Sequence, residues 1–296
     1  MIIVFNPVAG RRRAQLLWRV LDVMVANGIR IELAETTQRG HAETIARAAA
    51  QSGTTLVVAA GGDGTIAEVA NGLMGSTTRL GVIPLGTANV LAHELNLPFA
   101  PAAVAAALAF GRTRPLWPGI CLSSGDGADS QAASRLFVQM LGVGFDAHVV
   151  TRLSIPLKRA IGRNAYAVQT LRELPRYDFT PIRLRLDGIE VEAASAIVSK
   201  GRLYAGTYTL SPNAKPGEPG FSVALFQHAG PWAALMYAAS LPLDQLHRAP
   251  GVRHLRASRI DFIGNHPAPA QADGDPAGYT PLSVRDAPGP IYVVVG

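Results

Sequence analysis

The sequence predicts two domains: an α/β N-terminal domain, built on a parallel sheet with helices on both faces, and a mainly antiparallel β-sandwich C-terminal domain. Strand-like and helix-like segments alternate up to residue 111, which is typical of a parallel sheet covered by helices. The stretch "RTRPLWPG" breaks this order, and short strand-like segments dominate after it. We therefore expect domains over residues 1–118 and 119–296.

In the first domain, predicted strands and helices follow one another in turn. The first helix shows the pattern clearly, because Leu17, Val20, Leu21 and Met24 recur at helical spacing and Gly28 is a suitable C-terminal cap. The predicted strands cover residues 2–6, 29–36, 54–62 and 79–86. The predicted helices cover residues 12–28, 40–53, 65–75, 88–97 and 101–111.

The second domain is predicted to consist of strands with two helical interruptions. Helical patterns cover residues 159–174 and 231–242, and the polar stretch 121–134 is expected to be a hairpin tip at the surface. For the last strand-like segment, packing back on the first domain is an alternative to packing in the second. The strand-like segments cover residues 134–144, 182–200, 206–214, 221–230, 259–265 and 291–295.

Composition narrows the functional class. The chain is 48% hydrophobic and can bury a sizeable core, and its single cysteine, Cys121, excludes an internal disulfide framework and fits a cytoplasmic location. We expect neither a secretory signal nor a membrane-spanning helix. The net charge of +6 is spread along the chain without interleaved aromatic residues, which argues against nucleic acid and leans towards peripheral contact with an anionic membrane.

The stretch "GGDGT", residues 61–65, follows a predicted buried strand and precedes a predicted helix. This layout suits phosphate, because bare backbone N–H groups and a helix N-terminus face the anion. Gly61, Gly62 and Gly64 permit close approach of the backbone to a ligand, and Thr65 can cap the helix or bind a phosphate oxygen. A tight turn without a ligand is the simpler alternative, but it needs fewer glycines.

The loop fits neither of two common nucleotide-binding fingerprints well. Residues 62–67 and 142–147 both match the dinucleotide pattern G-x-G-x-x-A, but the first follows a third strand and the second lies in the strand-rich half. No Walker A motif is present, which excludes a P-loop kinase. Polar loops also follow the other predicted strands of the first domain, at the edge where parallel sheets bind ligands. These loops contain Asn6, Gly10 and Arg11; Thr36 and Thr37; and Gly86, Thr87 and Asn89.

Together, "NPVAG", "GGDGTIAEVANGL" and "PLGTANVLAHEL" resemble, in order and spacing, the catalytic domain of diacylglycerol kinases and related lipid kinases. "GVGFDAHVV", "LKRAIGRNAYAVQTLREL" and "QADGDPAG" extend the resemblance over essentially the whole chain. The soluble bacterial lipid kinases of the YegS/DgkB type are the most similar in length and layout. The resemblance implies an NAD-kinase/diacylglycerol-kinase-like fold of two domains, with ATP in the cleft between them.

The resemblance also implies which residues bind ATP and Mg²⁺. Asp63 would act on the phosphates through Mg²⁺ and its water network, since a cation can bridge a carboxylate to a phosphate. Glu68 and Asn71, on the helix that follows, are expected to hold the loop. The nucleotide site would comprise Asn6, Pro7, Val8, Ala9, Gly10, Thr36, Gly61, Gly62, Asp63, Gly64, Thr65, Ile66, Ala67 and Thr87.

A second acidic site is predicted at Asp273-Gly274-Asp275, where relatives usually carry Asp-Gly-Glu. Asp273 is the first choice and Asp275 the second for the base that takes the proton of a lipid hydroxyl. A plain β-turn is the alternative, because Asp-Gly is ordinary there. The family often carries a structural Mg²⁺ as well, but Pro219 stands where its Asp would be, which leaves only Glu218, one residue early.

We therefore predict an ATP- and Mg²⁺-dependent phosphotransferase that acts on a hydroxyl of a membrane lipid, with diacylglycerol as the first choice of substrate and phosphatidic acid as its product. Its partners would be ATP and the lipid, and a homodimer is one option for its assembly. One alternative is an NAD kinase-like enzyme, whose GGDGT motif is related. Another alternative is an inactive regulator that binds nucleotide or lipid. The only feature of the sequence that favours it is Asp275 in place of the usual Glu.

Overall fold

The computed structural model describes residues 1–8, 14–123, 134–153, 164–264 and 266–296. The chain divides into two compact units. The first comprises Met1–Trp117 with Pro288–Gly296, and the second comprises Pro118–Ala287. The C-terminal segment therefore returns to the first unit, where strand β20 (Ile291–Val295) joins the sheet.

The first unit contains one six-stranded sheet in the order β2-β1-β3-β4-β20-β5. All its neighbouring strands pair in parallel except β20 and β5, which are antiparallel. The parallel sheet of the prediction is thus confirmed, with an added antiparallel edge strand at "RTRPL", where an edge position tolerates Pro115. The remaining strands are β1 (Ile2–Phe5), β2 (Glu32–Glu35), β3 (Leu56–Gly61), β4 (Arg79–Pro84) and β5 (Arg112–Leu116).

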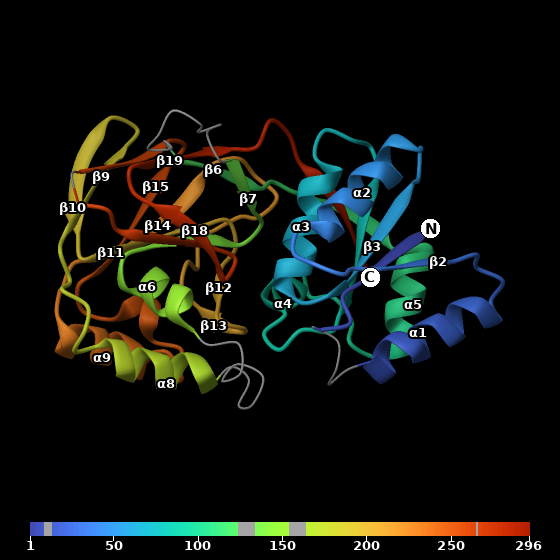
Figure 1. Cartoon of the computed structure of the whole chain (residues 1–296), viewed down its shortest axis with the longest axis horizontal. Helices are drawn as coiled ribbons and strands as arrows, with labels where there is room; N and C mark the ends of the chain where they lie inside the picture. Colours follow the sequence, from blue (N-terminus) through green and yellow to red (C-terminus); the bar gives the residue numbers. More distant parts are fainter. Residues whose placement is uncertain (9–13, 124–133, 154–163, 265) are drawn as a thin grey trace. The chain divides into compact units, whose positions relative to one another are not determined.

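Helices cover both faces of this sheet, as predicted (Figure 1). Helices α1 (Ala14–Ala26) and α5 (Pro101–Phe110) bury apolar side chains such as Leu17 and Leu108 in one core with β1, β3 and β4. Helices α2 (His41–Gln51) and α3 (Asp63–Leu73) pack together on the other face. Gly72 permits their close approach, because a Cβ there would lie 2.4 Å from the backbone oxygen of Glu43.

The second unit contains two six-stranded antiparallel sheets that share one hydrophobic core, which is the predicted sandwich. Their orders are β10-β9-β16-β19-β6-β7 and β15-β14-β11-β8-β17-β18. The strands of the first sheet are β6 (Gly119–Ser123), β7 (Ser134–Phe137), β9 (Ile182–Leu186), β10 (Ile189–Ala193), β16 (Ile260–Ile263) and β19 (Leu282–Asp286). Those of the second are β8 (Met140–Val143), β11 (Ser195–Ser199), β14 (Phe221–Phe226), β15 (Val252–Ala257), β17 (Pro269–Ala272) and β18 (Asp275–Tyr279).

Shorter elements also occur in the described part of the second unit. They are the helices α6 (Phe145–Arg152), α8 (Asn164–Glu173) and α9 (Pro231–Ser240), the 3-10 turn η1 (Leu246–Arg248), and the two-residue strands β12 (Leu203–Tyr204) and β13 (Tyr208–Thr209). The sequence pattern did not predict α6, because the apolar run of β8 leads directly into this eight-residue helix. Most of the predicted hairpin tip lies outside the described residues, although the flanking strands β6 and β7 do pair in the antiparallel direction.

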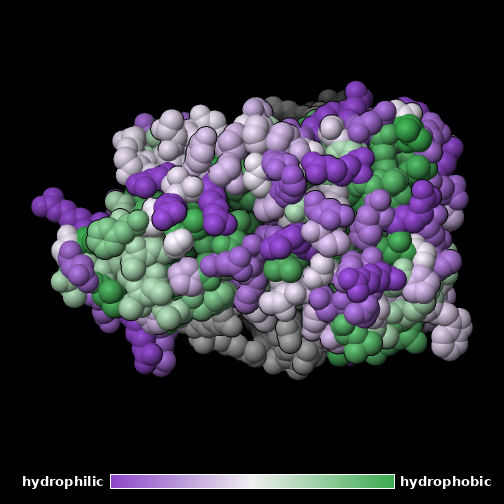
Figure 2. Space-filling view, turned by 180° about the vertical axis from the view of Figure 1, so that it is seen from behind, coloured by the Kyte–Doolittle hydropathy of each residue, from purple (hydrophilic) through white to green (hydrophobic). Residues whose placement is uncertain are grey.

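The surface mixes hydrophilic and hydrophobic residues over the face shown in Figure 2, without one block of either kind. Across the described parts of the chain, every helix is too short or too polar to cross a membrane.

Candidate functional site

The glycine loop forms the start of α3. Gly62 is the N-cap and Asp63 is the first helical residue. The N–H of Ile66 bonds the oxygen of Gly62 at 3.0 Å, so the first intrahelical bond begins there. Because glycine has no side chain, Gly62 cannot cap the N–H groups that precede Ile66. This helix start therefore has the donors and the partial positive charge that suit an anion.

Packing inside the protein explains two of the nearby glycines. A Cβ on Gly61 would lie 2.5 Å from Oγ1 of Thr65, and a Cβ on Gly86 would lie 2.5 Å from Cα of Gly62. The loops after β3 and β4 therefore touch backbone to backbone. Glycine at these positions is required by the fold itself, whether or not a ligand is bound.

Hydrogen bonds tie the neighbouring loops to α3. Nδ2 of Asn6, after β1, donates to Oγ1 of Thr65 at 3.0 Å. Glu68 accepts the N–H groups of Gly40 and Ala42 at the start of α2. Asn71 donates to Glu43 at 2.6 Å. Glu68 and Asn71 therefore have a structural role, but these contacts join α3 to the start of α2 and not to the glycine loop that they were expected to hold.

Asp63 links the glycine loop to the short helix α4 (Val90–Glu94). Its Oδ1 accepts the N–H of Leu91 at 3.2 Å, near the start of that helix. Burial raises the pKa of Asp63, and the backbone hydrogen bonds oppose this shift. The carboxylate among the glycines thus has a structural partner in addition to any bound cation.

The other predicted nucleotide residues differ in accessibility. Thr36 and Pro7 are half-buried, whereas Val8 and Thr87 are exposed. Ile66 is fully buried, so its side chain cannot touch a nucleotide, and Gly64 and Ala67 are half-buried. Ala9 and Gly10 lie outside the described residues.

In the second unit, Asp273 and Gly274 form the two-residue turn between β17 and β18, with φ of 49° and 84°. The carboxylate of Asp273 accepts three backbone N–H groups, from Val138 at 2.6 Å and from Gln139 and Met140 at 2.9 Å. Its own N–H donates to the oxygen of Met140 at 2.9 Å. Asp273 therefore holds the β7–β8 connection.

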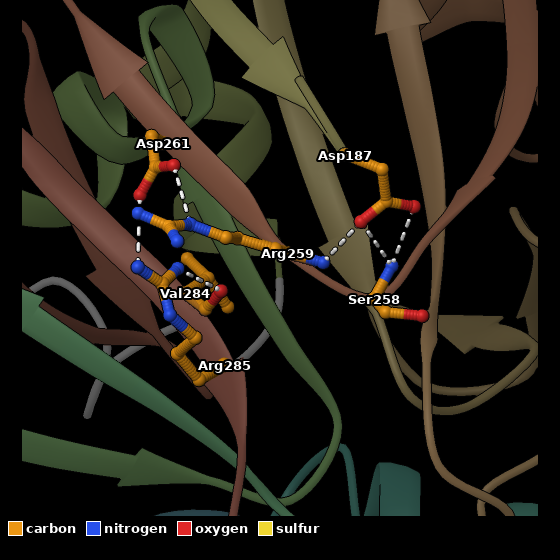
Figure 3. A network of polar contacts seen from close by, with 6 residues as sticks. All are labelled: Asp187, Ser258, Arg259, Asp261, Val284 and Arg285. Atoms are coloured by element: carbon orange, nitrogen blue, oxygen red, sulfur yellow. Dashed lines mark hydrogen bonds and ion pairs between the residues drawn. The ribbon is translucent and has the colours of Figure 1, made fainter. Parts of the chain in front are cut away.

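A second turn in this unit repeats the arrangement (Figure 3). Asp187 and Gly188 connect β9 to β10 with φ of 48° and 95°. The carboxylate of Asp187 accepts the N–H groups of Ser258, at 3.0 Å, and Arg259, at 2.8 Å, while its N–H donates to the oxygen of Arg259 at 3.0 Å. The same type of structural contact therefore occurs at both Asp-Gly turns of this unit.

Asp275 has different surroundings. Its carboxylate meets Nη2 of Arg135 at 3.0 Å, and its side chain is 39% exposed. Arg135 also donates to the oxygen of Pro276, which fixes the guanidinium beside the turn. Both predicted acids are half-buried, but the carboxylate of Asp275 pairs with a side chain, whereas that of Asp273 accepts three backbone N–H groups.

A partly buried network, which the sequence pattern did not single out, supports the turn at Asp273 and Gly274. Tyr204 donates a hydrogen bond to Asp146 on α6, and Gln271 donates to the same carboxylate at 3.0 Å. Oε1 of Gln271 accepts the N–H of Gly274 at 2.8 Å. Burial raises the pKa of Asp146 and raises that of Tyr204 well above its usual value. The "GFDA" segment carries this carboxylate, but its spacing alone gave no sign of a partner in β17.

The residues expected to hold a structural Mg²⁺ do not fit that ion. The carboxylate of Glu218 pairs with Lys215 at 2.9 Å, and both side chains are more than half exposed. No cluster of three or more acidic, histidine or cysteine side chains suited to a metal occurs among the described residues. Cys121 is buried, which raises the pKa of its thiol to about 12 and fits the expected inert cysteine.

The chain combines an α/β unit that carries glycine-rich loops with an antiparallel sandwich unit, and models of one protein family match both. The model of the diacylglycerol kinase catalytic domain matches residues 1–121, and that of the YegS C-terminal NAD kinase β-sandwich-like domain matches residues 139–295. The chain therefore belongs to the diacylglycerol kinase family, in its YegS-type form. As a member of this lipid kinase family it is a phosphotransferase.

Individual relatives cover most of the chain. The diacylglycerol kinase of Bacillus subtilis is 28% identical over 94% of this chain and 90% of its own length. A YegS-like protein of Chromohalobacter salexigens is 29% identical over 81% and 76%, respectively. The crystal structure of a diacylglycerol kinase from Bacillus anthracis superposes with a TM-score of 0.69 at 17% identity, covering 100% of this chain and 96% of that one. A yeast NADH kinase gives 0.51 at 13% identity, covering 100% and 83%, so the fold is shared with that enzyme too.

Proposed function

We propose that this protein transfers the γ-phosphoryl group of ATP to a hydroxyl of a membrane lipid, with diacylglycerol as the first candidate. The observation that carries the proposal is the start of α3 at Gly62, uncapped by a side chain and flanked by the loops after β1 and β4. In a member of a lipid kinase family, such a helix start suits the phosphates of a nucleotide.

The first unit would bind ATP through backbone donors. We assign the N–H groups of Gly64 and Thr65 to the phosphates, with Asn6 keeping Thr65 in place and Thr87 exposed beside the loop. Asp63 would hold α4 and reach Mg²⁺ through water, consistent with its bond to Leu91. Bound Mg²⁺ would neutralise charge that develops on the phosphates.

Asp275 is our choice for the base, ahead of Asp273. It is half-open to solvent, whereas three backbone N–H groups already occupy Asp273. Asp275 would take the proton of the lipid hydroxyl as the lipid oxygen bonds to the γ-phosphorus. The bond from that phosphorus to the bridging oxygen then breaks, and ADP leaves. Asp273 would keep Asp275 in position through the turn.

Helix α9 is our candidate for contact with the membrane. Ala234 is buried and Tyr237 packs against the core, so this side of α9 faces the protein. Trp232 is 84% exposed and Leu235 is 38% exposed, three residues further on. Leu243, just after the helix, is 71% exposed. An outward apolar stripe with an exposed tryptophan is typical of a helix that lies in a lipid interface.

The transfer of labelled γ-phosphate from ATP tests the activity. The acceptors should include diacylglycerol, a sphingoid base, monoacylglycerol, phosphatidylglycerol and NAD. We expect labelled phosphatidic acid from diacylglycerol, dependent on Mg²⁺. Preferential labelling of NAD would replace the lipid assignment, and no labelling of any acceptor would favour an inactive regulator.

Sedimentation with anionic vesicles tests the membrane surface. Trp232→Ala with Leu235→Ala should weaken binding to phosphatidylglycerol vesicles several-fold. The matched control is Ile189→Ala, which changes an exposed apolar residue (71% exposed) on a strand. Equal binding by both variants would remove α9 from the proposal.

A further inference from the structure

Lys200 is a buried lysine in the sandwich domain. It follows strand β11, and its side chain is 0% exposed. Lysine is rarely buried unless its ammonium group is paired, because removing the charge from water is costly. The ammonium group of Lys200 therefore needs hydrogen-bond acceptors or a negative charge that compensate for its lost hydration.

Three oxygen atoms surround the ammonium group. Nζ donates to the backbone oxygens of Glu218 at 3.0 Å and Gly220 at 2.9 Å, and to Oδ1 of Asp286 at 2.8 Å. An ammonium group has three N–H donors, so each donor has one acceptor here. The ring of Phe221 lies 4.7 Å away and adds a cation–π contact.

Two of these oxygens come from the segment where the family resemblance implies a structural ion. Glu218 and Gly220 lie just before strand β14, and Asp286 ends β19 in the other sheet. Oδ2 of Asp286 also accepts the N–H of Gly220 at 2.6 Å. Lys200 and Asp286 thus connect this loop to both sheets of the sandwich, with one positive charge opposite one negative charge.

We infer that the ammonium group of Lys200 takes the place of a structural divalent cation in this protein. The oxygens lie 2.8–3.0 Å from Nζ, at hydrogen-bond distance, whereas Mg²⁺ requires oxygens at roughly 2.0–2.1 Å. Residue 219 is proline and Glu218 pairs with Lys215, so neither supplies a carboxylate here, and the one carboxylate among these oxygens, that of Asp286, already pairs with Lys200. The sandwich domain therefore needs no metal to fold. This inference concerns that domain alone and holds whichever substrate the enzyme phosphorylates.

Thermal unfolding of the wild-type chain without nucleotide is the first test. We expect the same Tm, within about 1 °C, in EDTA and in excess MgCl₂. A structural ion bound at saturation would raise Tm by roughly 5–10 °C. A rise of that size in the wild-type protein would overturn the inference.

Substitution of the lysine is the second test. Lys200→Met removes the charge at similar length and leaves the carboxylate of Asp286 without its cation, so we expect Tm to fall by roughly 10 °C. The control Lys215→Met removes an exposed ion pair and should shift Tm by less than about 1 °C. Equal Tm values for these two variants would contradict the role of Lys200. If Lys200→Met does not fold, the metal response of the wild-type chain still decides.

Discussion

The two Asp-Gly turns of the sandwich domain share a conformation and differ in the residue that follows. In both, the aspartate and the glycine have positive φ, and the carboxylate accepts backbone N–H groups of a neighbouring connection. After Asp187-Gly188 comes Ile189, which is 71% exposed. After Asp273-Gly274 comes Asp275, paired with Arg135.

This difference distinguishes the structural residue of the motif from the residue that can act on a substrate. The first aspartate is explained at both turns by the backbone groups that it binds. The catalytic role that we propose therefore falls on the position where the turns differ, which is Asp275. Asp63 in the first unit resembles these two aspartates, because its carboxylate also accepts a backbone N–H of another segment.

Removing the turn carboxylates should give the largest loss of stability. Asp273→Ala leaves three backbone N–H groups without an acceptor, and Asp187→Ala leaves two. We expect the free energy of unfolding to fall by about 3 and about 2 kcal/mol, respectively. Denaturant titration measures both values.

Activity then distinguishes the two variants. Asp187→Ala should keep its kcat at temperatures where it is folded, whereas Asp273→Ala should lose kcat because Asp275 moves with the turn. A stable Asp273→Ala protein with the wild-type free energy of unfolding would contradict the structural role.

Asp63 extends the comparison to the first unit, with a smaller effect. Asp63→Ala removes the acceptor at the start of α4 and should cost about 1–2 kcal/mol of stability. Asp63→Asn keeps an acceptor and removes the charge, so it isolates the titration of the carboxyl group.

The sign of this titration follows from burial. Burial raises the pKa of Asp63 in the folded protein. The wild-type protein should therefore be most favoured, relative to Asp63→Asn, below the ordinary pKa of 3.8, and should lose that advantage as the pH rises through the folded pKa. Denaturant titrations of both proteins between pH 4 and pH 7 measure the difference. A difference that moves the other way would show that the ionised carboxylate is favoured in the fold.

The glycines of the two turns should show the smallest effect. Gly188 has φ of 95° and Gly274 has φ of 84°, where a side chain costs about 1 kcal/mol. Gly188→Ala meets no atom within 4 Å, and Gly274→Ala meets only Tyr166 at 3.9 Å, so both should lose similar stability. Kinase assays should show lower activity for Gly274→Ala alone. Equal loss of activity in both would mean that the position of Asp275 does not matter.

Much of the fold and the positions of the loops could be predicted from local patterns in the sequence. Alternating strand and helix signals sufficed for β1 to β4 and their helices, because each element has its own apolar period. Strand β5 was not predicted, and the return of strand β20 to the first domain was predicted only as an option, since their pairing joins segments far apart in the chain. The roles of Asp273 and Lys200 depend on partners more than 130 and 80 residues away, respectively, which no local pattern reveals.

The kcat of Asp275→Asn, measured beside its free energy of unfolding, tests the central claim most directly. The account predicts a loss of about 100-fold or more in phosphoryl transfer to the preferred lipid, because the proton acceptor is removed. It also predicts a change in stability of less than about 1 kcal/mol, because the pair with Arg135 is partly exposed to solvent. A folded Asp275→Asn protein with wild-type kcat would contradict the account.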